Sequence, residues 1–286
     1  MPSIAEIRPS PIAGTWYLGD PERLAKQIDG FIRAAKLPPL DGDVVALIAP
    51  HAGHRYSGRT AGHAFRCVLG QQRDLVVVVS PLHGFSPDPL LTSAHKAYAT
   101  PLGAIPIDRE ALYALDRTLR QDAGLTLMAL ANDNEHSLEI ELPFLQRALA
   151  GDFRLLPLMI HSQAPDLAQQ LGHALAQVIQ QNPRPNGALL VASTDLSHFY
   201  PELEADRLDS EMLKQIGEFS PTGVLEAEQS GRGFACGVMA VASVLYAARE
   251  LGANAVELLH HSTSADETGD HDSVVGYGAA VVLKRA

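Results

Sequence analysis

Three apolar segments of this sequence each end in a short polar cluster. The polar residues are His51 and His54 after 44–50, His83 after 74–80, and Asp195 and His198 after 188–193. Because an open α/β sheet carries its functional groups at the carboxyl ends of its strands, we expect these side chains to converge on one edge. Imidazole and carboxylate groups gathered there can bind a metal ion or transfer protons.

Cys236 adds a sulfur atom to this set. It follows Gly233 and precedes an apolar helix predicted over 238–251, where free N–H groups would stabilise a thiolate. A thiolate and two imidazoles form a site suited to zinc, iron or copper. The alternative is a buried, inert cysteine. That interpretation is favoured for Cys67, the other cysteine of the chain.

Asp195 and His198 are three residues apart in a predicted turn, so the carboxylate can orient the imidazole for proton transfer. The alternative is that Asp195 caps a helix beginning near Tyr200. Glu135 and His136 lie in a helix predicted to open at 132–141, and capping is again the alternative to a role in the site. His54 is a weaker candidate.

Strand and helix patterns alternate from end to end, and no linker divides the chain. We therefore predict a single α/β domain over 1–286 with a doubly wound, mostly parallel sheet. The strands at 44–50 and 74–80, separated by one helix, are predicted to be parallel neighbours. The strand at 154–160 contains Pro157 and is predicted to lie nearer an edge.

Composition excludes several classes of function. The 286 residues carry a net charge of −11, which argues against nucleic acid as a partner. No stretch reaches the roughly 18 apolar residues of a membrane span. The N-terminus lacks the basic-then-apolar pattern of a signal peptide, so a cytoplasmic location is expected. Trp16 and Tyr17 are expected to pin an irregular N-terminal arm to the body.

Four segments together resemble the Memo family. They are 50–58 (PHAGHRYSG), 133–143 (DNEHSLEIELP), 193–198 (STDLSH) and 235–237 (ACG). Arg8, 14–17 and 276–277 fit the ends of the family pattern, so the resemblance spans nearly the whole chain. It implies a fold similar to that of class III extradiol non-haem iron dioxygenases.

The resemblance also implies a site. Its metal ligands would be His51, His83 and Cys236, holding Fe(II) or copper, with zinc as an option, and Asp195 and His198 would share the pocket. Prokaryotic members are described as component B of a system with a radical-SAM protein and an AMMECR-type protein. The animal member binds a phosphotyrosine peptide. The dioxygenases use two histidines and a carboxylate, so a cysteine ligand leaves catechol cleavage open.

The leading hypothesis is a metal-dependent, dioxygenase-like oxidoreductase acting on a small molecule. His198 would be its acid–base group, oriented by Asp195, with His136 as a further catalytic residue. The remaining pocket would be lined by Glu135, His54 and Trp16. One rival is a non-catalytic module that binds a ligand or peptide. Another is a hydrolase or transferase with Cys236 as nucleophile and His198 as base.

Overall fold

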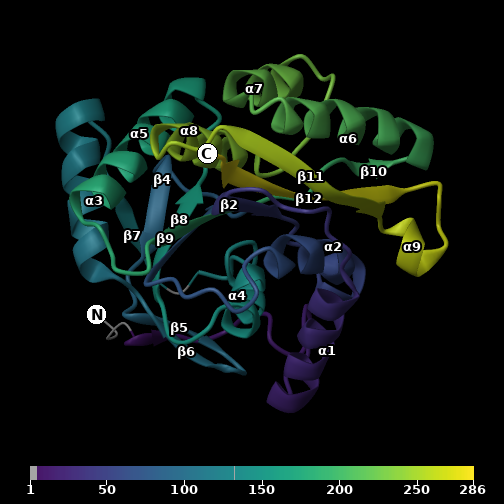
Figure 1. Cartoon of the computed structure of the whole chain (residues 1–286), viewed down its shortest axis with the longest axis horizontal. Coiled ribbons are helices and arrows are strands. Elements are labelled where there is room, and N and C mark those ends of the chain that lie inside the picture. The colour runs from purple at the N-terminus through teal and green to yellow at the C-terminus, as the bar shows by residue number, and fades with distance from the viewer. Residues whose placement is uncertain (1–4, 132) are drawn as a thin grey trace.

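The computed structural model describes residues 5–131 and 133–286 and is built around one mixed sheet (Figure 1). The strand order is β10-β12-β2-β9-β3-β8-β4-β7, and β11 also pairs with β12. The strands are β2 (Asp43–Ala49), β3 (Leu75–Pro81), β4 (Leu90–Ser93), β7 (Met128–Leu130), β8 (Arg154–Ile160), β9 (Ala188–Ser193), β10 (His198–Tyr200), β11 (Ala255–Thr263) and β12 (Val274–Lys284). A separate small sheet joins β1 (Ile7–Arg8), β5 (Ala97–Thr100) and β6 (Gly103–Pro106).

Helices cover both faces of the main sheet, as the predicted doubly wound α/β fold requires (Figure 1). One face carries α3 (Arg109–Ala123), α5 (Pro165–Gln181), α6 (Glu202–Gly217), α7 (Pro221–Gln229) and α8 (Val238–Glu250). The other carries α1 (Pro21–Ala34), α2 (His54–Arg66) and α4 (Leu142–Ala148), and α9 (Ala265–Thr268) lies beyond the end of β11. No helix in the described ranges is long and apolar enough to cross a membrane.

The sheet mixes parallel and antiparallel pairs, and its four central strands run in one direction. Strands β2, β9, β3 and β8 run parallel, whereas β12 and β4 flank them in the antiparallel direction. The central strands are almost completely buried because helices cover both faces, which explains their continuous apolar sequences. The prediction of a mostly parallel sheet is therefore confirmed for the four central strands, which antiparallel pairs join to the strands on either side.

Two predictions about strand position are wrong. Strands β2 and β3 are parallel but not neighbours, because β9 lies between them and pairs with both. Strand β8 lies inside the sheet despite Pro157. Its pairing with β4 covers only Met159 and Ile160, so the missing N–H of Pro157 falls outside that ladder.

The helix predicted to open at 132–141 begins later than expected. Asn132 lies outside the described residues. Residues 133–138 are irregular, a 3-10 turn covers Glu139–Glu141, and α4 follows. The leucines of this stretch are nevertheless buried at helical spacing: Leu138, Leu142, Leu145 and Leu149 all belong to the core. The irregular segment passes beside the carboxyl ends of the central strands, where the polar residues gather.

Candidate metal centre

The strand order gathers the predicted polar residues at one edge of the sheet. His51 follows β2, Asp195 follows β9 and His83 follows β3, and these three parallel strands are adjacent in the sheet. The position of β9 between β2 and β3 therefore inserts Asp195 between the two histidines.

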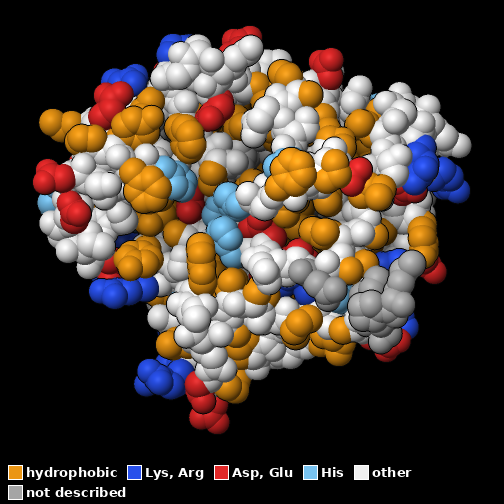
Figure 2. Space-filling view, turned by 180° about the vertical axis from the view of Figure 1, so that it is seen from behind, with side chains coloured by type: hydrophobic (Ala, Val, Ile, Leu, Met, Phe, Trp, Pro, Cys, Tyr) orange, Lys and Arg blue, Asp and Glu red, His pale blue; other side chains and the backbone are white. Residues whose placement is uncertain are grey.

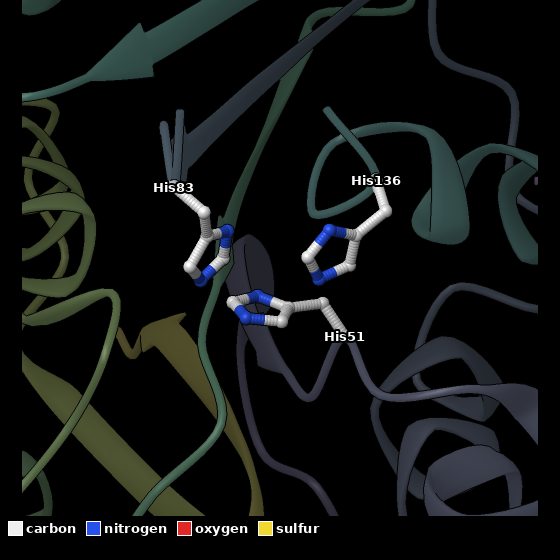
Figure 3. Close-up of side chains that lie close together, drawn as sticks. All are labelled: His51, His83 and His136. Carbon is white, nitrogen blue, oxygen red and sulfur yellow. The ribbon is translucent and has the colours of Figure 1, made fainter. Parts of the chain in front are cut away.

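Three histidines form a cluster at this edge (Figure 3). One nitrogen from each of His51, His83 and His136 lies within 4.8 Å of the other two, close enough for a single ion to contact all three. The centroids of the His83 and His136 rings are 4.8 Å apart, and the His51 ring stands almost perpendicular to both. Among the described residues, this is the only group with such geometry.

Each imidazole is fixed through its Nδ1 atom. Nδ1 of His51 lies 3.0 Å from Ser193 Oγ, and those of His83 and His136 lie 3.0 and 3.2 Å from Glu135 Oε1. The Nε2 atoms of His83 and His136 are thereby left for a ligand, and that of His51 lies beside Cys236. Metal-binding histidines are held in the same way, with the second ring nitrogen hydrogen-bonded to a carboxylate or another polar group. The donor set and its support therefore fit a transition-metal ion.

Glu135 contacts two of the three cluster histidines, His83 and His136. Besides contacting both rings, its carboxylate accepts the backbone N–H groups of His83, His136 and Ser137 at 2.6 to 2.9 Å. Burial by itself raises the pKa of Glu135, but these hydrogen bonds outweigh it and hold the pKa well below its usual range. Glu135 was predicted to line the pocket, yet it is absent from the cavity wall.

Cys236 lies beside the cluster, outside the group of three histidines. Its Sγ is 3.1 Å from His51 Nε2 and 3.3 Å from the backbone nitrogen of Asp195. Gly237 permits this close approach, because a Cβ there would lie 2.3 Å from the carbonyl oxygen of Ser193. Burial, reinforced by Asp195, raises the pKa of the Cys236 thiol rather than stabilising a thiolate. The cluster thus differs from the predicted ligand set by having His136 as its third imidazole.

A cavity of about 740 Å³ opens in front of the histidines. In the space-filling view, histidine side chains lie in a hollow bordered by hydrophobic groups (Figure 2). Its wall includes the three cluster histidines together with Trp16, Tyr56, Asp195, His198, Phe199 and Tyr277. Trp16 was predicted to line the pocket, and its ring centroid lies 4.0 Å from that of His136.

His54 was predicted to line the pocket, but it is buried in the core. Its ring packs against Tyr17 and Phe144, and its Nε2 lies 3.1 Å from the carbonyl oxygen of Ile140. Burial lowers the pKa of His54 to about 4, so the ring is neutral at physiological pH. Its position as the first residue of α2 turns the side chain away from the edge that His51 occupies.

Asp195 and His198 both line the cavity but have separate partners. Oδ1 of Asp195 accepts the backbone N–H groups of His51 and Ala52 at 2.7 and 3.2 Å, which fixes the turn after β2. Nδ1 of His198 donates to the carbonyl oxygen of Leu196 at 2.8 Å. His198 is therefore oriented by its own backbone rather than by Asp195. Asp195 also does not cap α6, whose N-cap residue is Pro201.

The two groups titrate differently. Burial raises the pKa of Asp195 to about 7, although the two backbone N–H groups oppose the shift. Burial lowers the pKa of His198, so its Nε2 carries a lone pair at neutral pH. A proton acceptor and a carboxyl group that titrates near neutrality thus face the same cavity.

Sequence reasoning missed two residues behind the cluster, Ser193 and Glu141. Ser193 ends the apolar strand β9 and contacts His51, and Glu141 is completely buried behind it. The available signals were a serine closing an apolar strand and a carboxylate between Ile140 and Leu142.

These features define an α/β protein with a three-histidine centre at the carboxyl edge of its parallel strands. Residues 8–281 match the family model of the Memo-like protein, and the chain belongs to that family. A MEMO1 family protein of Methanopyrus kandleri is 34% identical over 284 residues, covering 96% of this chain and 98% of the relative. Similar proteins of Methanothermobacter thermautotrophicus and Nitrosopumilus maritimus are 33% and 30% identical, covering 95% and 96% of this chain and 98% of each relative.

Proposed function

We propose that this protein binds one transition-metal ion through His51, His83 and His136 and uses it to transform a small molecule. The observation that carries this proposal is the convergence of the three rings, one nitrogen of each lying within 4.8 Å of the other two. Each Nδ1 atom lies beside Ser193 or Glu135, as in supported metal ligands. Surface histidines have no reason to share such an arrangement.

Iron(II) or copper is the metal that we propose, with zinc as the alternative. Imidazole donors suit all three metals. Cys236 Sγ adds a softer donor 3.1 Å from His51 Nε2, so it stays a candidate for a further coordination position. The resemblance to extradiol dioxygenases favours iron. Such an ion supplies redox chemistry or polarises a bound oxygen atom.

The residues of the cavity define the substrate class. Its volume of about 740 Å³ is in the range typical for small-molecule ligands. Trp16, Tyr56 and Phe199 offer aromatic walls, which suit a flat and partly apolar molecule such as a catechol. His198 would accept a proton from it at Nε2, and Asp195 would hold or release a proton near neutral pH.

Cysteine-nucleophile catalysis has less support. The Cys236 thiol is buried, burial raises its pKa, and the imidazole nitrogen that it contacts belongs to His51 instead of His198. A nucleophilic cysteine requires a lowered pKa or an adjacent free base. The location in the cytoplasm and the association with radical-SAM and AMMECR-type proteins stay predictions.

The deciding experiment is elemental analysis for iron, copper and zinc on protein purified anaerobically without chelator. We expect about one iron or copper ion per chain, followed by oxygen-dependent turnover when catechol-like compounds are screened. Zinc alone would redirect the proposal to hydrolysis. Metal without turnover, together with a tightly held small molecule, would favour a binding module. Absence of metal after reconstitution with each ion would overturn the proposal.

A further inference from the structure

Three polar atoms surround the hydroxyl group of Ser193. Ser193 Oγ lies 2.6 Å from the carbonyl oxygen of Ser137, 2.8 Å from Oε1 of Glu141 and 3.0 Å from Nδ1 of His51. All three distances are within the hydrogen-bonding range, and the site is fully buried. A hydroxyl group donates one hydrogen bond and accepts two, so the protons at this junction can be assigned.

The carbonyl oxygen of Ser137 decides the assignment, because it can only accept. It must receive the single Ser193 proton, since otherwise two oxygens with only lone pairs would face each other at 2.6 Å. The other two neighbours must then donate to Ser193 Oγ. His51 donates through Nδ1–H, and Glu141 can donate only if its carboxyl group is protonated.

We propose that Glu141 is a neutral carboxylic acid that donates its proton to Ser193 Oγ and so helps to hold His51 in the Nδ1–H tautomer. Glu141 is a positioning residue in this arrangement, since it acts on the cluster through Ser193. The Ser193 O–H donates to the Ser137 carbonyl oxygen, and each lone pair of the hydroxyl group accepts one hydrogen bond. Nε2 of His51 then keeps its lone pair for a metal ion.

The surroundings of Glu141 agree with this assignment. Its side chain is completely buried, and within the described residues its Oε2 has no hydrogen-bond partner. An unpaired carbonyl oxygen is far less costly to bury than an unpaired carboxylate charge. Burial, opposed by Ser193 and reinforced by Asp195, raises the pKa of Glu141 well above its ordinary value.

The opposite side of His51 supports the same tautomer. Cys236 Sγ lies 3.1 Å from His51 Nε2, within the distance at which an S–H group donates to a ring nitrogen. An S–H group can donate to Nε2 only when Nε2 carries the lone pair. His51 thus donates on one side and accepts on the other.

Infrared difference spectroscopy of metal-free protein tests the protonation of Glu141. At neutral pH, wild type minus Glu141→Gln should show the C=O stretch of a protonated carboxyl group, shifted down in heavy water. The exposed Glu110→Gln control should instead lose carboxylate bands. If Glu141→Gln does not fold, Ser193→Ala should move the same band upward, because the acid loses its acceptor. Carboxylate bands alone, or an unmoved band in Ser193→Ala, would overturn the proposal.

Nitrogen NMR of labelled, metal-free protein tests the tautomer of His51. Wild type should carry its proton at Nδ1, whereas Ser193→Ala should show a mixture of tautomers. Metal affinity should fall about 10- to 100-fold in Ser193→Ala, as is usual when the support of a metal ligand is removed. A proton at Nε2 in wild type would contradict the inference. Only the change in metal affinity depends on the proposed function. Because the spectroscopic readouts need no metal, failure of the metal proposal would leave them intact.

Discussion

Two groups of three histidines lie at different ends of helix α2. The first is the cluster of His51, His83 and His136, next to the start of the helix. The second lies near its last turns, where His63 of α2 faces His260 of β11, and the next residue of β11, His261, contacts Asp209 of α6. The rings of His63 and His260 stack with centroids 4.2 Å apart and planes tilted by 15°. Both groups join residues distant in sequence.

Their hydrogen bonds differ in pattern. In the first group, Nδ1 of every ring lies 3.0 to 3.2 Å from Ser193 or Glu135, and one nitrogen of each ring lies within 4.8 Å of the other two. In the second, His63 and His260 are held by Nδ1, but His261 uses Nε2 to contact Asp209 at 2.8 Å. Stacking alone does not separate the two groups, because the rings of His83 and His136 are also stacked, with planes tilted by 19°. The comparison teaches that the convergence of one nitrogen from each ring, and not the number of histidines, distinguishes the candidate metal centre among the described residues.

Removing one ligand should produce the largest difference between the two groups. We expect His83→Ala to lose stoichiometric metal, because two imidazoles provide too few donors for a stable site. His260→Ala, the matched variant in the second group, should retain wild-type metal content. Elemental analysis and circular dichroism of both variants check the expectation. Full metal occupancy in His83→Ala would show that the cluster is not the binding site.

Removal of the Glu135 carboxylate, which holds His83 and His136, should have the next largest effect on metal binding. Glu135→Ala removes the acceptor of two imidazoles and of three backbone N–H groups. We expect metal affinity to fall by about 10- to 100-fold, and the free energy of unfolding to fall by roughly 3 to 5 kcal/mol. Competition with a chromophoric chelator and denaturant titration measure the two quantities. A variant that loses stability but binds metal normally would limit Glu135 to a structural role.

The sequence predicts which residues lie at the carboxyl edge of the sheet better than it predicts which of them form the histidine cluster. His51, His83 and Asp195 each follow a buried apolar strand, and local pattern is sufficient to place them at strand ends. The order of the strands is not a local property. Nothing in the spacing of β2 and β3 indicates that β9, more than a hundred residues later in the chain, lies between them.

The position of His136 is a second case of long-range control. The polar residues 133–136 match a helix start, but Arg8 of the N-terminal arm holds this segment in an irregular course. Its buried guanidinium group contacts the Asp133 carboxylate at 3.0 Å and the Glu135 carbonyl oxygen at 2.7 Å. These contacts between the N-terminal arm and segment 133–136 turn Glu135 and His136 toward His83. Helix propensity of the segment alone contains no such information.

The buried carboxyl group of Asp195 should give the first site a characteristic pH dependence. The pKa of Asp195 is raised to about 7 in the fold, so the folded protein binds more protons than the unfolded chain between about pH 4 and about pH 7. Asp195 therefore lowers stability as pH rises through this window. In chelator-treated protein, Asp195→Asn should become more stable relative to wild type by roughly 2 to 4 kcal/mol across it. Denaturant titrations at several pH values measure this difference in the free energy of unfolding. A difference that stays constant with pH would contradict the raised pKa of Asp195.

In the second group, the neighbouring residues His260 and His261 should change the pH dependence of stability less, and in opposite directions. Burial opposes protonation of His261, but the Asp209 hydrogen bond outweighs it and raises the pKa of His261. Its contribution to stability should be complete below about pH 6.5 and be lost as pH rises through the folded pKa. His260 has a lowered pKa because of burial and then the nearby His63, so its contribution should be lost as pH falls. We expect His261→Gln and His260→Gln to shift the free energy of unfolding by under about 1 kcal/mol each between pH 6 and pH 8, with opposite slopes. Equal slopes in denaturant titrations would show that Asp209 does not distinguish these two histidines.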